Sequence, residues 1–214
     1  MQPIRLVIFD FDGTLADSEA WFAATLNQVA RKFGFRETGF HERERLRSLS
    51  SREIIGELGV PLWKMPLIVA HLRQLANRDI DHIPRFPWVE NLFAQLTAAG
   101  TAIAIVSSNT EENIRRVLGP ASVHVATFGA GASLFGKAAR FRRVLKRLGV
   151  PPSAAMAVGD EVRDIEAARQ VGVASVAAGW GFATADALQA AHPDAFAADA
   201  PMRADILRGA RVPV

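Results

Sequence analysis

Short apolar runs alternate with amphipathic segments along most of this chain, and this order limits the possible folds more than any other feature. Nearly all of the runs lack a regular exchange of polar and apolar residues, which indicates strands buried on both faces. They cover residues 4–9, 102–106, 123–128, 154–158 and 175–177. Helical spacing of apolar residues is found over residues 88–99, 111–118, 137–148 and 164–171. We therefore predict an α/β fold with a parallel sheet covered by helices on both sides.

A long helical stretch interrupts this order after the first strand. Its first helix is predicted to have Asp17 or Ser18 as its N-cap. Further helical segments follow around residues 42–49, 51–58 and 62–78. Because the stretch is too long for an ordinary crossover between parallel strands, we predict an insertion. The expected division is an α/β core of residues 1–15 plus 85–214 and an α-helical unit of residues 16–84.

The composition argues against several classes of protein. The 214 residues include 25 Lys and Arg against 22 Asp and Glu, and a net charge of +3 is too small to favour nucleic-acid binding. The chain has no cysteine, which leaves oxygen or imidazole ligands for any metal and fits a reducing compartment. It has no secretory signal pattern, and no apolar run approaches the roughly 18 residues of a membrane span. We expect a cytoplasmic protein that binds neither nucleic acid nor membranes.

Acidic residues follow the first and fourth predicted strands. Asp10 and Asp12 come directly after the first strand, where a divalent cation or a shared proton would relieve their repulsion. An ordinary turn is the alternative, because Asp and Gly are common turn residues. The fourth strand is followed by Asp160, Glu161 and Asp164, although acids are also favoured in the first turn of a helix. In open α/β sheets, ligands bind outside the carboxyl ends of the strands, where both groups are expected.

Two further segments have residues suited to holding an anion. Ser107, Ser108 and Asn109 follow the second strand, and their hydroxyl and amide groups can hold a phosphoryl oxygen. Alternatively, Ser108 or Asn109 is the N-cap of the next helix. Lys137 begins the most basic stretch of the chain, residues 137–147, and most of the charges in this stretch are expected on a solvent-facing helix surface. A cation at a helix start opposes the helix dipole, so either an anion lies near Lys137 or its position is due to chance.

Taken in order, these segments resemble the four motifs of the haloacid dehalogenase superfamily. Residues 9–15 match its first motif, 106–109 its second, 136–137 its third and 159–164 its fourth. The resemblance implies a Rossmann-like, doubly wound parallel sheet in which the insertion forms the α-helical cap of the family. The layout is similar to that of phosphoglycolate-phosphatase-like members.

The resemblance also implies a reaction and a cofactor. It assigns Asp10 as the nucleophile and Asp12 as the general acid and base, with Mg²⁺ bound by the Asp10 carboxylate, the Asp12 backbone carbonyl and Asp160. Asp164 completes the metal site by orienting bound water or Lys137. Because dehalogenases of the superfamily lack a carboxylate in the place of Asp12, its presence favours phosphoryl transfer.

The implied activity is that of a Mg²⁺-dependent phosphatase acting through an aspartyl-phosphate. Ser107 and Lys137 would stabilise the transferring phosphoryl group, and Ser108 and Asn109 would help to bind it. The expected partner is a small phosphorylated metabolite, either phosphoglycolate-like or a sugar phosphate, acted on by a monomer or homodimer.

The remaining predictions concern substrate selection and rival functions. Arg47 or Arg52 of the insertion could bind a substrate carboxylate or hydroxyl, unless both simply face solvent. Glu161 departs from the small or hydroxyl residue commonly found next to the metal-binding Asp160, which puts the detailed metal shell in question. Two alternatives stay open: a phosphotransferase of the β-phosphoglucomutase type and a non-catalytic interaction module with the same fold.

Overall fold

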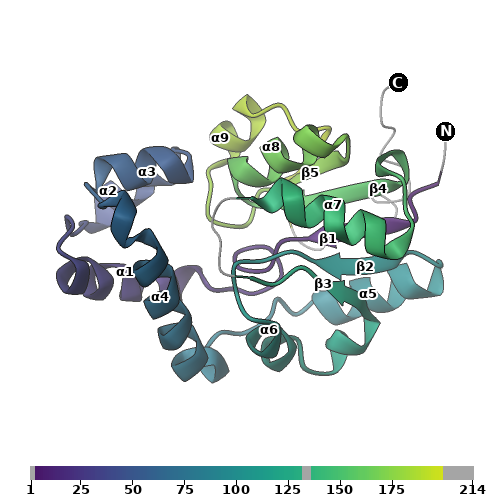
Figure 1. The fold of residues 1–214 in the computed structure, drawn as a ribbon, viewed down its shortest axis with the longest axis horizontal. Coiled ribbons are helices and arrows are strands. Elements are labelled where there is room, and N and C mark those ends of the chain that lie inside the picture. The colour runs from purple at the N-terminus through teal and green to yellow at the C-terminus, as the bar shows by residue number, and fades with distance from the viewer. Residues whose placement is uncertain (1–2, 132–135, 200–214) are drawn as a thin grey trace.

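The core of the molecule is a parallel six-stranded sheet with the strand order β3-β2-β1-β4-β5-β6 (Figure 1). The computed structural model describes residues 3–131 and 136–199. The strands are β1 (Leu6–Phe9), β2 (Ala102–Ile105), β3 (Val125–Phe128), β4 (Ala155–Gly159), β5 (Ala174–Ala178) and β6 (Ala195–Ala197). Strands β2 and β3 lie on one side of β1, and strands β4, β5 and β6 lie on its other side. This order confirms the predicted doubly wound α/β fold.

Helices cover both faces of the sheet, as the apolar runs predicted. The pair α5 (Val89–Ala98) and α6 (Glu111–Leu118) lies on one face, and α7 (Lys137–Leu148) with α8 (Val162–Val171) lies on the other (Figure 1). Alternate residues of β1 pack into different clusters, with Phe9 joining Phe93 of α5 and Ile8 joining Phe141 of α7. Because both faces are buried, β1 needs apolar residues at every position.

Two elements near the end of the described chain were not predicted. Helix α9 (Ala185–Ala190) begins at the N-cap Thr184, whose side chain accepts a hydrogen bond from the backbone of Ala187. Strand β6 pairs in parallel with β5 and forms the edge of the sheet. The sheet therefore has one strand more than the five that the apolar runs indicated.

The helical insertion lies between β1 and α5 and contains its own apolar cluster. It consists of α1 (Glu19–Phe33), α2 (Phe40–Leu46), α3 (Ser51–Glu57), η1 (Leu62–Lys64), α4 (Met65–Asp79) and η2 (Ile80–His82). Ser18 is the N-cap of α1, as one of the two predicted candidates. Val29 of α1 packs with Met65, Ile68 and Val69 of α4 in a cluster separate from those of the sheet. None of the described helices is long and apolar enough to cross a membrane.

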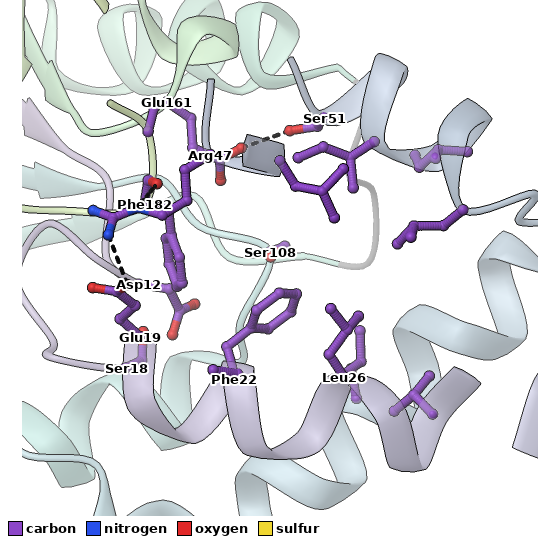
Figure 2. Close-up of a pocket in the computed structure, with 18 of the residues that line it drawn as sticks. Asp12, Ser18, Glu19, Phe22, Leu26, Arg47, Ser51, Ser108, Glu161 and Phe182 are labelled. Carbon is purple, nitrogen blue, oxygen red and sulfur yellow. Dashed lines mark hydrogen bonds and ion pairs between the residues drawn. The ribbon is translucent and has the colours of Figure 1, made fainter. Parts of the chain in front are cut away.

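The insertion is joined to the sheet by two segments that lie side by side. Ala16 and Arg85 form an antiparallel bridge, and the backbone N–H of Asp17 donates to the carbonyl of Pro84 at 2.9 Å. Between the insertion and the carboxyl edge of the sheet is a cavity of about 410 Å³ (Figure 2). Ala16 also forms a bridge with Asp12, which lines this cavity, so the segments that join the insertion to the sheet lie beside the cavity.

Candidate active site

Asp10 lies where β1 ends, at the edge of the sheet that borders the cavity. Its backbone N–H donates to the carbonyl of Val158 in β4 at 2.8 Å, so the carboxyl ends of the two strands are aligned. Ser107 follows β2, and Asp160 directly follows β4. The parallel register brings Asp10, Ser107 and Asp160 to one edge, and all three are buried.

Lys137 joins two of the buried acids. It is the first residue of α7 and is only 8% exposed. Its Nζ lies 2.9 Å from Oδ1 of Asp10 and donates a hydrogen bond to Oδ1 of Asp164. Burial disfavours the charged ammonium, but attraction to Asp10 and Asp164 outweighs burial and raises the pKa of Lys137. The structure thus places anions beside Lys137 at the start of α7. Of the two alternatives, a nearby anion or a chance position, the first is confirmed.

Asp160 is fully buried and held from two sides. Its Oδ1 accepts a hydrogen bond from Thr14 Oγ1 at 2.5 Å, and its Oδ2 accepts one from the backbone N–H of Phe182 at 2.8 Å. Burial, followed by repulsion from Asp10 and other nearby acids, raises the pKa of Asp160 well above its usual value. Holding this carboxylate ionised therefore calls for a further positive charge.

Gly13 allows the loop after β1 to pass directly beside Asp160. Its φ is +75°, and a Cβ at this position would overlap the Asp160 carboxylate and the ring of Phe182. Gly34 has a similar φ of +72°, but a Cβ there would meet only Lys64 Nζ, at 3.9 Å. The two glycines therefore differ in steric surroundings and not in backbone conformation.

We expect Gly13→Ala to lower the free energy of unfolding by about 3 kcal/mol, because positive φ and steric overlap both oppose the new side chain. Gly34→Ala, the matched control, should cost only about 1 kcal/mol, the part due to φ alone. Urea unfolding of both variants measures the difference. Equal losses would show that the loop moves away from Asp160 without cost.

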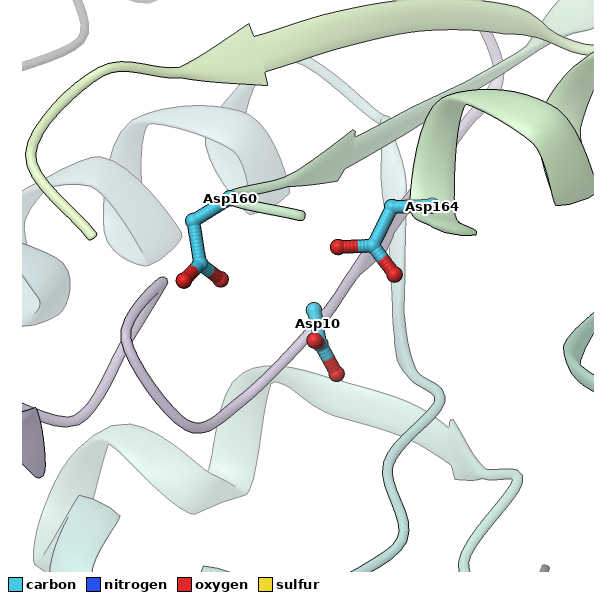
Figure 3. Close-up of side chains that lie close together, drawn as sticks. All are labelled: Asp10, Asp160 and Asp164. Atoms are coloured by element: carbon cyan, nitrogen blue, oxygen red, sulfur yellow. The ribbon is translucent and has the colours of Figure 1, made fainter. Parts of the chain in front are cut away.

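Three buried acids form a site that suits a small, hard cation. Asp10, Asp160 and Asp164 converge from the ends of β1 and β4 and from α8 (Figure 3), and their nearest carboxylate oxygens lie within 4.8 Å of one another. Burial raises the pKa of Asp164 to about 6 despite its contact with Lys137. Oxygen ligands in this number and a need for positive charge fit Mg²⁺, which binds few carboxylates and keeps several waters. The Asp12 carboxylate is not in this group, and the metal ligand predicted from Asp12 is its backbone carbonyl.

Asp12 lies at the end of the cavity, two residues beyond Asp10, and is partly exposed (Figure 2). Burial and then repulsion from Asp10 raise the pKa of Asp12 to about 6, although the nearby side chains of Asn109 and Ser18 favour its charged form. A carboxyl group with this pKa can both give and take a proton near neutral pH. The geometry and the pKa suit the predicted general acid and base.

The loop after β2 has a fixed shape. Ser107 Oγ accepts a hydrogen bond from the backbone N–H of Asn109 at 2.9 Å. Ser107, Ser108 and Asn109 all line the cavity. The N-cap of α6 is Thr110, whose side chain accepts from the backbone of Asn113, so the prediction of Ser108 or Asn109 as N-cap is wrong. Asn109 precedes the cap, and its Oδ1 accepts hydrogen bonds from the backbone N–H of Thr110 at 2.9 Å and from Asn113 Nδ2 at 3.0 Å.

Arg140 is a residue of this site that sequence reasoning missed. It is only 6% exposed, and its Nη1 donates to the carbonyls of Ser107 and Gly131 at 3.0 and 3.1 Å. Most charges of the basic stretch face solvent as expected, but Arg140 does not, and Lys137 lies in the site predicted for it. Their spacing of three residues places both on one face of α7, which was the available signal.

The two arginines predicted to select the substrate have different surroundings. Arg47 joins the insertion to the core, because its Nε donates to the carbonyl of Phe182 at 2.9 Å and its Nη2 to that of Gly181 at 3.0 Å. Its Nη1 also lies 3.2 Å from Glu19 Oε1. Arg52 is exposed and does not line the cavity. The structure therefore brings Arg47, but not Arg52, to the site predicted for both.

Glu161 faces the insertion. Its Oε2 accepts a hydrogen bond from Ser51 Oγ at 2.6 Å, and its Oε1 is paired with Arg163. Arg73 of α4 makes a second contact across the cavity by donating to the carbonyl of Ser108. Glu161 is outside the cluster of three acids that could hold a metal among the described residues. The Glu161 side chain thus contacts the insertion, while Asp160 remains in the cluster of three acids.

Comparisons with known proteins point to one family. The sequence matches the haloacid dehalogenase-like hydrolases over residues 7–178. It is 35% identical to the phosphoglycolate phosphatase of Synechococcus elongatus, over 89% of this chain and 91% of that protein. It is 28% identical to the tyrosine-protein kinase PtkA of Mycobacterium tuberculosis, over 85% of this chain and 64% of the kinase. A solved haloacid dehalogenase-like family hydrolase from Streptococcus pneumoniae has a TM-score of 0.70 at 21% identity, covering 93% of this chain and 96% of that chain.

Proposed function

The chain belongs to the haloacid dehalogenase-like hydrolases and is a phosphatase of that family, and we propose that it hydrolyses a small phosphomonoester through an aspartyl-phosphate on Asp10. The observation that supports this most directly is the contact between Lys137 and both Asp10 and Asp164, beside Asp160 and at the end of a cavity. A buried nucleophile, a cation and a group of metal ligands are the parts that phosphoryl transfer requires.

We propose Mg²⁺ as the cofactor, held by the carboxylates of Asp10 and Asp160 and the backbone carbonyl of Asp12, with Asp164 oriented beside them. When bound, the cation neutralises charge on the phosphoryl group and the repulsion between that group and Asp10. The three acids of the cluster offer the oxygen ligands that this cation prefers. Lys137 fixes the side chains of Asp10 and Asp164 relative to each other.

The proposed reaction has two steps. In the first, a carboxylate oxygen of Asp10 forms a bond to phosphorus while the ester oxygen leaves and takes a proton from Asp12. In the second, Asp12 takes a proton from water as the water oxygen attacks phosphorus, which breaks the bond to Asp10 and releases phosphate. Ser107 and Lys137 stabilise charge on the phosphoryl oxygens in both steps.

Asp12→Asn tests the proton transfer to the leaving group. We expect kcat/KM for an alkyl phosphate to fall by about 10²- to 10⁴-fold, because the alkoxide then leaves without a proton. The loss for 4-nitrophenyl phosphate should be at least about tenfold smaller, since nitrophenolate is a stable leaving group. Phosphate release over a range of substrate concentrations measures both values. Asp17→Asn, an exposed acid in the same loop, is the matched control. Equal losses for the two substrates would contradict the role of Asp12 as a general acid.

The insertion is proposed to act as a cap over the leaving group. Ser51 and Arg73 of the insertion contact the core at Glu161 and Ser108, and all four residues line the cavity. A cap held in this way excludes water and contacts the part of the substrate beyond the phosphate. Residues 16–84 are therefore the segment in which we place substrate selection.

A phosphate-release screen tests the function as a whole. The panel contains 2-phosphoglycolate, sugar phosphates and simple alkyl phosphates, each measured with and without Mg²⁺. We expect steady, metal-dependent release of phosphate from at least one of them. A phosphotransferase of the β-phosphoglucomutase type would instead convert a sugar phosphate into its isomer with no net release, and an interaction module would do neither.

A further inference from the structure

The part of the cavity beyond the phosphoryl site is an apolar chamber. Most of the lining residues that α1, α3 and α4 contribute have apolar side chains (Figure 2). The chamber is defined by apolar lining residues of these helices that are partly exposed, Trp21, Phe22, Leu26, Ile54, Ile55 and Leu72. Phe22 and Leu26 project from α1 into it, and the Phe22 ring packs edge-on against Phe182, 5.6 Å between centroids. At about 410 Å³, the whole cavity is large enough for a substrate well beyond the phosphate itself.

The chamber and the phosphoryl site are parts of one continuous cavity. Asp10, Asp12 and Ser107 line the same space as Leu26 and Leu72. A phosphomonoester with its phosphorus beside Asp10 must therefore direct its leaving group toward the helices of the insertion. The groups that line the chamber then decide which leaving groups bind well.

The cations that line the cavity are already bound to oxygen atoms of the protein. Arg47 donates to two backbone carbonyls and pairs with Glu19, and Arg163 pairs with Glu161. The other two arginines of the lining also bind backbone oxygens. Arg43 donates to the carbonyl of Ala23, and Arg73 donates through both Nε and Nη2 to the carbonyl of Ser108. A carboxylate in the leaving group would compete with these protein oxygen atoms for the arginines, whereas an apolar leaving group would leave all of these contacts in place.

Taking the proposed phosphatase function as given, we infer that the preferred substrate is a phosphomonoester with an apolar leaving group. Such a leaving group would remove apolar surface of the chamber from water on binding. This class differs from the carboxylated substrate in the name of the relative from Synechococcus elongatus. The chamber residues that decide the preference come from the insertion, and the catalytic acids come from the sheet.

Two substrates of equal shape test the inference on the unaltered enzyme. Isobutyl phosphate has the shape of 2-phosphoglycolate, with an isopropyl group in place of the carboxylate. With Mg²⁺ present, we expect kcat/KM for isobutyl phosphate to exceed that for 2-phosphoglycolate by at least about tenfold. In the series from methyl to butyl phosphate, kcat/KM should rise about two- to fourfold for each added methylene group. A preference for 2-phosphoglycolate, or a flat series, would overturn the inference.

Leu26→Gln tests the chamber directly. We expect it to lower kcat/KM for butyl phosphate about three- to tenfold and to change that for methyl phosphate less than twofold. Leu67→Gln is the matched control, because Leu67 belongs to the same insertion, is 58% exposed and does not line the cavity. Equal effects of Leu26→Gln on the two substrates would show that the leaving group does not enter the chamber.

The outcomes separate this inference from the proposed function. If no phosphomonoester is hydrolysed in the presence of Mg²⁺, the proposed function fails and the inference fails with it. If phosphomonoesters are hydrolysed but the enzyme prefers 2-phosphoglycolate, only the inference fails. The comparison of the two equal-shaped substrates needs no variant and therefore does not depend on whether Leu26→Gln folds.

Discussion

Replacing Asp10 by Asn is expected to lower kcat for every phosphomonoester by about 10⁴-fold or more. The amide keeps the shape of the side chain but is a poor nucleophile, so no bond to phosphorus forms. Loss of the negative charge also removes one partner of Lys137, which keeps its contact with Asp164. Phosphate release under saturating substrate measures the effect, and circular dichroism checks the fold.

A matched control separates this effect from a general loss of charge. Asp81 is exposed, lies in the insertion, is paired with Arg116 at 2.9 Å and does not line the cavity. Asp81→Asn should leave kcat unchanged within about twofold, because surface ion pairs contribute little. Turnover by Asp10→Asn above about 1% of the parent rate would mean that another group attacks phosphorus.

Removal of divalent metal is expected to lower turnover by about 10³-fold or more, with full recovery when Mg²⁺ is returned. Without a metal cation, the carboxylates of Asp10, Asp160 and Asp164 lie together in a buried site. Lys137 contacts Asp10 and Asp164 but not Asp160. The raised pKa of Asp160 reflects that burial and repulsion. Phosphate release after treatment with a chelator, followed by titration with Mg²⁺, measures both parts of the result.

The same cation should stabilise the fold, because it binds the native arrangement of acids and not the unfolded chain. At a Mg²⁺ concentration 100 times its Kd, we expect a rise in Tm of about 5–10 °C. Asp160→Asn should lose most of this rise, whereas Asp81→Asn should retain it. An equal rise in Asp160→Asn would place the metal elsewhere, and full turnover in chelator would exclude a metal requirement.

Much of the fold could be predicted because the strands are buried on both faces. In β1, Phe9 and Ile8 face different helix layers, so the strand has no polar position and stands out as an apolar run. The short edge strand β6 has no such signal. Its three residues are stabilised as a strand mainly by pairing with β5, a contact distant in sequence that local patterning does not record.

The acids of the site were found for a related reason, whereas Arg140 and the actual contacts of Arg47 were missed. Asp10 and Asp160 follow buried strands directly, and parallel strands bring their carboxyl ends together. Arg140 and Arg47 instead bind backbone carbonyls of Ser107, Gly181 and Phe182, which have no sequence signature. An arginine bound to carbonyl groups looks, in sequence, like an arginine in solvent.

The antiparallel bridge between Ala16 and Arg85 has an evolutionary consequence. Since the chain leaves the sheet and rejoins it at one place, helices can be gained, lost or exchanged there without altering the order of the strands. Mutations in the insertion change which substrate is bound, while the acids at the strand ends keep their positions. Selectivity and chemistry can thus diverge at different rates within a single polypeptide.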